Sequence, residues 1–122
     1  MILVDTSVWI DHLGRGDIPG LVQLLEEGEV LCHPFVIAEI ALGSPSDREQ
    51  ALKLLKALPA APVAASEELM VLISGARLGG TGIGFVDAHL LAACRISRSM
   101  LWTRDKRLDA QAQRLGCAWP PS

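Results

Sequence analysis

Residues 1–7 read Met-Ile-Leu-Val-Asp-Thr-Ser, an apolar run that stops at a carboxylate and two hydroxyls. The run at 2–4 predicts a short, fully buried strand, and a helical pattern starts directly after it at 8–13. Asp5 therefore stands where a strand ends. Ligands of open α/β sheets bind in the crevice beyond the carboxyl ends of the strands, so Asp5 is a candidate functional group. The competing interpretation is that Asp5 or Ser7 only caps the following helix.

Composition limits the fold and the classes of function. With 122 residues, the sequence predicts a single domain spanning 1–122. Half of the residues are hydrophobic and 20% are charged, which excludes disorder and favours a sheet covered by helices on both faces. Aromatic residues make up only 4%, which argues against a protein that holds single-stranded nucleic acid mainly on aromatic platforms.

Cysteine usage and hydropathy indicate the compartment. Cys32, Cys94 and Cys117 form no Cys-x-x-Cys pair, and their odd number fits a reducing environment. Asp5 interrupts the first apolar segment, which argues against a secretory signal. No apolar run reaches the ~20 residues that a membrane-spanning helix needs. We therefore expect a cytoplasmic, soluble protein that does not bind membranes.

Strand and helix patterns alternate along the rest of the chain. Further strands are predicted at 30–33 and 100–103, with short ones near 63 and at 117–119. The helical patterns between them lie at 18–25, 34–42, 46–58, 66–77, 85–97 and 106–115. Such alternation favours an α/β fold with a mainly parallel central sheet of four to five strands flanked by helices. Glycines at 79–84 lack a phosphate-binding register, so we interpret them as a hinge or a close backbone approach.

Two further acids occupy unusual positions on predicted helices. Glu39 falls within Phe-Val-Ile-Ala-Glu-Ile-Ala-Leu (35–42), and Asp87 is followed one turn later by Leu90 and Leu91. A carboxylate in apolar surroundings raises its pKa, finds a basic partner or binds a cation. The alternatives are that Asp87 caps its helix and that Glu39 is a buried acid paired with a distant arginine.

Asp105 repeats the position of Asp5, because it directly follows a strand and can cap the next helix. Two acids are therefore predicted at strand ends and two on apolar helix faces that can pack over the same edge. Converging carboxylates repel one another, so such a cluster needs positive charge. Hard divalent cations, Mg²⁺ or Mn²⁺, suit oxygen ligands, whereas the histidines and cysteines lack the spacing of a zinc site.

Four motifs in order resemble those of the PIN-domain nucleases. The motifs are Asp5-Thr6-Ser7, Glu39 in Pro-Phe-Val-Ile-Ala-Glu-Ile, Asp87 in Ile-Gly-Phe-Val-Asp-Ala-His-Leu-Leu-Ala-Ala, and Thr103-Arg104-Asp105. The resemblance covers nearly the whole chain and is greatest to the VapC toxins of bacterial toxin–antitoxin pairs. It implies a PIN-like three-layer fold, a short antitoxin partner and a homodimer. Some relatives carry another acid where this chain has Leu90 and Leu91.

The implied activity is a Mg²⁺- or Mn²⁺-dependent endoribonuclease that serves as the toxin of a type II toxin–antitoxin system. Asp5 and Asp87 would ligate the metal directly, and Glu39 and Asp105 would bind a second ion or orient its water. All four are thus expected to be catalytic metal ligands, and the metal would activate water for phosphodiester hydrolysis. Capping of the first helix would then fall to Ser7 or Thr6.

Polar and basic neighbours complete the predicted site. The hydroxyls of Thr6 and Thr103 are expected to fix the orientation of the carboxylates. Arg104, Lys106 and Arg107 are candidates for binding RNA phosphates. The formal net charge of −3 opposes a polyanionic substrate, but bound divalent cations would offset it.

Other functional classes remain open on the sequence alone. The chain is alternatively a housekeeping PIN-domain RNA-processing nuclease, or a non-catalytic PIN-like module that binds RNA or protein. A phosphoacceptor receiver domain needs adjacent acids after its first strand, and here Thr6 follows Asp5. A phosphatase of the Asp-x-Asp type requires an acid where this chain has Ser7.

Overall fold

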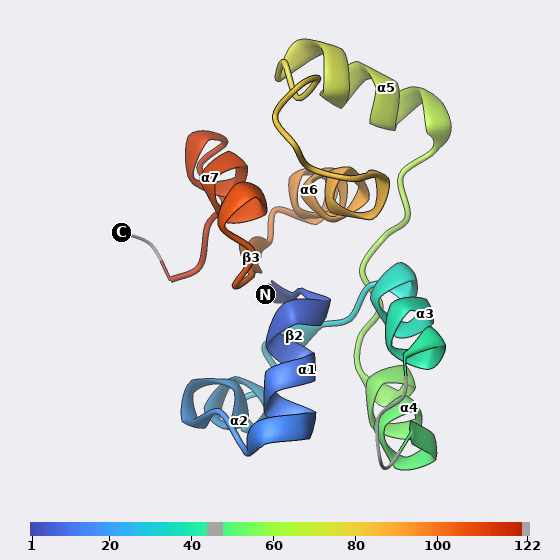
Figure 1. The fold of residues 1–122 in the computed structure, drawn as a ribbon, viewed down its shortest axis with the longest axis vertical. Helices are drawn as coiled ribbons and strands as arrows, with labels where there is room; N and C mark the ends of the chain where they lie inside the picture. The colour runs from blue at the N-terminus through green and yellow to red at the C-terminus, as the bar shows by residue number, and fades with distance from the viewer. Residues whose placement is uncertain (44–47, 121–122) are drawn as a thin grey trace.

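The protein folds as a short parallel sheet with helices on both sides (Figure 1). The computed structural model describes residues 1–43 and 48–120. In chain order the elements are β1 (Ile2–Val4), α1 (Thr6–Arg15), α2 (Pro19–Glu26), β2 (Val30–Leu31), α3 (Pro34–Leu42), α4 (Arg48–Ala57), α5 (Ser66–Gly75), α6 (Phe85–Ser97), β3 (Met100–Trp102) and α7 (Lys106–Arg114).

The sheet has the strand order β2-β1-β3, and both pairs of neighbouring strands are parallel. This confirms the predicted α/β class and the parallel pairing. Of the four to five strands expected, three form within the described residues. Single parallel bridges, Cys32 with Ala60 and Leu101 with Ala118, occupy the two edges. No strand forms at Val63 in this part of the chain, because Pro59 and Pro62 beside the Ala60 bridge lack the N–H groups that a ladder needs.

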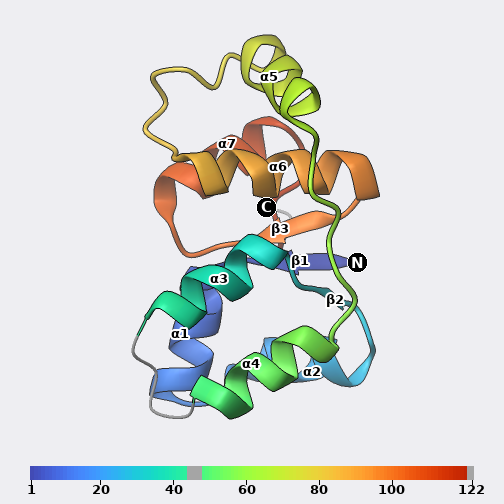
Figure 2. The ribbon, with the colours of Figure 1, turned by 90° about the vertical axis from the view of Figure 1, so that its right-hand side faces the viewer.

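The sheet lies between two layers of helices, as the PIN-like prediction required. Figures 1 and 2 show α5, α6 and α7 on one side of the sheet and α1 to α4 on the other. Leu3 and Val4 in β1 are fully buried. On α6 every residue from 88 to 94 is buried, so this helix is the centre of its layer. The apolar residues of β1 and α6 thus form the core on which the polar edge is built.

Helix boundaries follow the sequence pattern closely. The helix predicted at 85–97 has those bounds, and the helix predicted at 66–77 ends slightly earlier, at Gly75. The predicted start of the helix at 46–58 lies outside the described residues, and α4 is described from Arg48. Within 1–43 and 48–120, no helix combines the length and the apolar character required to cross a membrane.

Candidate metal centre

The carboxyl ends of β1 and β3 bring Asp5 and Asp105 to the same edge of the sheet. Val4 pairs with Trp102 in register, and the Asp5 N–H donates to the Trp102 carbonyl at 2.9 Å. Asp5 is buried, with 6% of its surface exposed, whereas Asp105 is exposed. Two acids that are 100 positions apart in numbering therefore follow adjacent strands, which is the arrangement expected from the sequence.

Asp5 is held by two hydroxyls. Its Oδ2 accepts hydrogen bonds from Ser7 Oγ at 2.8 Å and from Thr103 Oγ1 at 2.7 Å. The same two hydroxyls accept backbone N–H groups, Ser7 from Arg104 and Thr103 from Asp105. Asp5 makes no side-chain cap bond to α1, so the capping interpretation of Asp5 is wrong. The expectation that Ser7 or Thr6 caps this helix is also wrong, because both residues lie inside α1 and, among the described residues, neither hydroxyl accepts a backbone N–H of the helix.

Asp105 does cap α7, as the alternative interpretation of this residue predicted. Its Oδ1 accepts the backbone N–H groups of Arg107 at 2.9 Å and Leu108 at 3.1 Å. This satisfies two of the free donors at the start of the helix. A capping carboxylate is thereby fixed in orientation, and its other oxygen points away from the helix bonds.

Glu39 is exposed, which corrects the expectation that it lies on a buried apolar face. The buried residues of α3 are Val36 and Ile40, and Leu42 is 87% exposed. Because α3 is apolar on nearly every side, its pattern does not define which face is buried. Glu39 Oε1 accepts a hydrogen bond from Thr6 Oγ1 at 2.7 Å. No ion pair with an arginine is found for Glu39 among the described residues.

Asp87 is half-buried in the first turn of α6. Its Oδ2 accepts the Gly84 N–H at 3.1 Å, so it assists the helix start from the third helical position. The alternative that Asp87 is itself the N-cap residue is wrong, because Gly84 occupies that position. Burial raises the pKa of Asp87, and the negative charges of Asp5, Asp105 and Glu39 raise it further, against the hydrogen bond from Gly84. The fold therefore brings Asp5, Glu39 and Asp105 within electrostatic reach of Asp87.

The donor chemistry of these four carboxylates fits a hard divalent cation. Each has one oxygen in a hydrogen bond with the chain, and the other has no hydrogen-bond partner among the described residues. These second oxygens are Asp5 Oδ1, Glu39 Oε2, Asp87 Oδ1 and Asp105 Oδ2. In the part of the chain that the structure describes, however, no three His, Cys, Asp or Glu side chains are close enough to ligate one ion together. The arrangement suits Mg²⁺, which keeps several waters and is commonly held by one or two carboxylates.

The candidate phosphate-binding residues differ in whether their charge is already paired with an acid. Arg104 Nη1 lies 2.6 Å from Asp11 Oδ2, so its charge is already paired. Arg107 lies against the loop before α6, where a Cβ built on Gly82 would be 3.0 Å from Arg107 Cδ. Lys106 is exposed at the start of α7. Arg107 and Lys106 thus form no ion pair within the described ranges, while Arg104 does.

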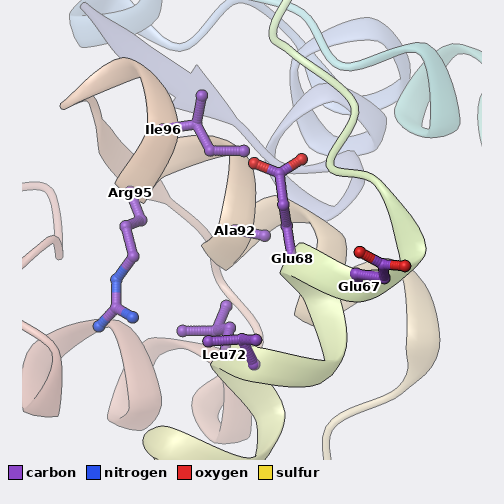
Figure 3. Close-up of a pocket in the computed structure, with 7 residues that line it drawn as sticks. Glu67, Glu68, Leu72, Ala92, Arg95 and Ile96 are labelled. Carbon is purple, nitrogen blue, oxygen red and sulfur yellow. The ribbon is translucent and has the colours of Figure 1, made fainter.

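Sequence reasoning missed the roles of Ser7 and Asp11. Ser7 had a local signal, since a hydroxyl two positions after an aspartate commonly bonds back to it. Asp11 had none, because its partner Arg104 is 93 positions away. A cavity of about 410 Å³ between α5 and α6, shown in Figure 3, is lined by Glu67, Glu68, Val71, Leu72, Ala92, Arg95 and Ile96, and therefore by none of the four acids.

Comparisons with known proteins agree with this fold. The sequence profile of the PIN domain matches residues 2–113. Ribonuclease VapC32 of Mycobacterium tuberculosis, in strains CDC 1551 / Oshkosh and ATCC 25618 / H37Rv, is 49% identical over 119 residues, which are 97% of this chain and 95% of that protein. The crystal structure of PAE2754 from Pyrobaculum aerophilum superimposes with a TM-score of 0.62 at 18% identity, covering 90% of this chain and 83% of that one, and shows the fold alone. The chain therefore belongs to the PIN-domain family and, within it, to the VapC-type ribonucleases.

Proposed function

We propose that the chain is a Mg²⁺- or Mn²⁺-dependent endoribonuclease that hydrolyses RNA phosphodiester bonds as the toxin of a type II toxin–antitoxin system. The observation that carries the proposal is the gathering of Asp5, Glu39 and Asp105 around Asp87, whose pKa is raised by burial and, further, by their charges. The 49% identity to Ribonuclease VapC32 over 97% of the chain supports the same activity. A like-charged cluster of this kind is stabilised when a divalent cation binds.

In this proposal the carboxylates would bind the metal, and neighbouring hydroxyls orient the carboxylates through hydrogen bonds. Asp5 and Asp87 would ligate the ion, and Glu39 and Asp105 would bind a second ion or orient a water. When bound, the metal supplies Lewis acidity, which lowers the pKa of water and offsets charge on the scissile phosphate. Thr103 and Ser7 restrict Asp5 by bonding to Oδ2, and Thr6 restricts Glu39 through Oε1. Each acid thus presents its second oxygen in a fixed direction.

Basic residues beside the carboxylates would bind the RNA backbone. Lys106 and Arg107 stand at the start of α7, next to Asp105, and contact phosphates without reading sequence. Arg104 joins them by exchanging its ion pair with Asp11 for a phosphate. We further propose that residues 1–122 act as one nuclease domain in the cytoplasm, as a homodimer, with a short antitoxin as partner.

Cleavage of RNA by the purified full chain tests the nuclease proposal. Total cellular RNA is incubated with the chain and Mg²⁺ or Mn²⁺, and the new RNA ends are mapped. Discrete ends should appear, disappear in excess EDTA and return when Mn²⁺ is added back. Asp5→Asn should abolish them, and Glu67→Gln, which changes an exposed acid of α5, should not. Equal cleavage in EDTA, or full activity of Asp5→Asn, would refute the metal mechanism.

Expression of the chain alone in bacterial cells tests the toxin role separately. The wild-type chain should arrest growth, and Asp5→Asn at the same protein level should not. Cleavage in the purified system without growth arrest would leave a nuclease and contradict the role as a toxin.

A further inference from the structure

Phe85 exposes an aromatic ring at the start of the helix that carries Asp87. It is the first residue of α6 and is 66% exposed. The other Phe and Trp side chains, all within the described residues, are buried or half-buried. Leaving a phenylalanine in water forgoes the favourable free energy of burying its side chain. One exposed apolar residue is common on proteins, so the surroundings of this ring have to show whether it has a role.

The ring of Phe85 packs against other aromatic rings. It stacks on Phe35 with a centroid distance of 6.3 Å and an interplanar angle of 21°. It also meets His89 edge-on, at 4.6 Å and 71°, and His89 packs in turn on Phe35 at 4.8 Å. Two helices, α3 and α6, thus fix the plane of an exposed ring. A fixed flat ring loses little conformational entropy when a second flat group stacks on it.

The position of the ring links it to the candidate metal centre. Phe85 directly follows Gly84, whose N–H donates to Asp87 Oδ2 at 3.1 Å. On α3, Phe35 lies one turn before Glu39, so the stacked rings join the two helices that carry these acids. A group stacked on Phe85 would therefore lie at the end of α6 that carries Asp87.

A cationic side chain packs against the loop that precedes Phe85. Arg107 packs its side chain against Gly82, three residues before Phe85, and forms no ion pair among the described residues. Adjoining segments therefore contribute three kinds of group: carboxylates suited to a metal, an exposed aromatic ring and a guanidinium without an ion pair. A nucleic acid strand presents both phosphates and flat bases, and single strands are bound by basic residues combined with aromatic rings.

We infer that Phe85 stacks on one unpaired nucleobase of the RNA beside the scissile phosphodiester, while Arg107 binds a neighbouring phosphate. The inference rests on the proposed function. It requires the base held by Phe85 to be unpaired, since a base inside a duplex cannot offer its face. One exposed ring holds one base, which agrees with the low aromatic content of the chain. Any base can stack on an aromatic ring, so this contact distinguishes unpaired RNA from duplex RNA more than it distinguishes one sequence from another.

Binding of a short single-stranded RNA that carries 2-aminopurine tests the inference. Ca²⁺ replaces Mg²⁺ so that the RNA stays intact, and 2-aminopurine fluorescence and anisotropy report stacking and affinity. The full wild-type chain should quench the fluorescence. Phe85→Leu and Phe85→Ala should lose the quenching and bind about 5- to 100-fold more weakly, because a stacked base contributes about 1–3 kcal/mol. Phe85→Trp should retain both properties, and the same RNA annealed to its complement should show no quenching.

Controls separate stacking from folding and from protein contacts. Val71→Ala, which changes an exposed apolar residue of α5, should bind RNA like the wild type. Circular dichroism melting should show that the Phe85 variants fold. Wild-type binding by Phe85→Leu, unchanged quenching by Phe85→Ala, or no RNA binding by the wild type would overturn the inference. A loss of antitoxin binding or of dimers alone would assign Phe85 to a protein interface instead.

The two proposals fail in different ways. If the wild-type chain cleaves RNA in Mn²⁺ and Phe85→Leu has an unchanged KM, the stacking inference is wrong and the nuclease proposal stands. If fluorescence is quenched but no RNA is cleaved in Mn²⁺, the nuclease proposal fails, and Phe85 is a stacking residue of a non-catalytic RNA-binding protein.

Discussion

The two oxygens of the Asp5 carboxylate have different surroundings. Oδ2 accepts hydrogen bonds from Ser7 and Thr103, and Oδ1 has no hydrogen-bond partner among the described residues. Hydrogen bonds to a charged acceptor are stronger than bonds between neutral groups, so they restrict the rotation of this side chain. A buried carboxylate with one bound and one available oxygen is prepared to ligate a cation at little entropic cost.

Removing the Thr103 hydroxyl tests this orientation. Thr103→Val keeps the shape of the side chain but deletes the donor to Asp5 Oδ2 and the acceptor of the Asp105 N–H. Activity and metal affinity should fall by about 10- to 100-fold, the usual loss when a group that orients a ligand is removed. Titration of cleavage against Mn²⁺ measures both. Thr103→Ser should restore most of the activity. Unchanged activity and Mn²⁺ affinity in Thr103→Val would show that the Thr103 hydroxyl does not orient Asp5.

Asp87 should be destabilising while no metal is bound. Burial and the charges of Asp5, Asp105 and Glu39 raise its pKa, so its charged form is disfavoured in the folded state. Asp87→Asn removes the charge and keeps an acceptor for the Gly84 N–H. In EDTA at neutral pH, Asp87→Asn should melt a few degrees above the wild type while losing nuclease activity. An unchanged or lower melting temperature would contradict the proposed crowding of negative charge.

His33 should make the fold sensitive to acid. Burial and the neighbouring His89 lower the pKa of His33 from 6.5 to about 4. Between pH 6.5 and pH 4 the unfolded chain binds a proton at this histidine that the folded chain does not. The stabilisation that the neutral His33 provides is therefore complete above pH 6.5 and is lost as the pH falls towards 4. The lost free energy of unfolding should reach about 3 kcal/mol. His33→Asn keeps a side-chain acceptor for the Phe35 N–H and should show a smaller decrease in urea unfolding between pH 7 and 4.5. Equal decreases in both proteins would contradict the assignment.

Among the elements, α6 depends on the glycine-rich loop that precedes it. Gly82 has φ +88, a conformation that strains any side chain, and a Cβ there would lie 3.0 Å from Arg107 Cδ. Gly82→Ala should lower the free energy of unfolding by about 1–2 kcal/mol and reduce activity, because the start of α6 holds Asp87. Gly79→Ala is the matched control, since Gly79 has no left-handed φ and no atom within 4 Å of a Cβ. Urea unfolding compares them, and equal effects would exclude a special requirement at Gly82.

The strand ends and α6 could be predicted from the sequence, because their signals are local. Parallel strands end at the same edge of a sheet, so the residues after β1 and β3 had to meet. The exposure of Glu39 could not be predicted, because α3 is apolar on nearly every side and has no distinct polar face. The pairing of Asp11 with Arg104 could not be predicted either, since only the folded chain brings these residues together across 93 positions.

At the scale of the whole molecule, the fold concentrates negative charge at one edge and covers both faces of the sheet with helices. The formal net charge of −3 and the repulsion around Asp87 both work against binding of RNA. Divalent cations at this edge would reduce the repulsion and create an attractive site for phosphates. Metal binding, RNA binding and stability of the folded state are therefore expected to change together.

The central claim is that these carboxylates form one metal centre that cleaves RNA, and Mn²⁺ titration tests it most directly. Free Mn²⁺ is followed by electron paramagnetic resonance with the full chain and with Asp5→Asn, Asp87→Asn and Glu67→Gln, and RNA cleavage is measured in the same samples. The wild type and Glu67→Gln should bind Mn²⁺ and cleave RNA in proportion to bound metal, whereas the other two should bind it at least about tenfold more weakly. Equal Mn²⁺ affinity in all four proteins, or cleavage that does not follow bound Mn²⁺, would contradict the account.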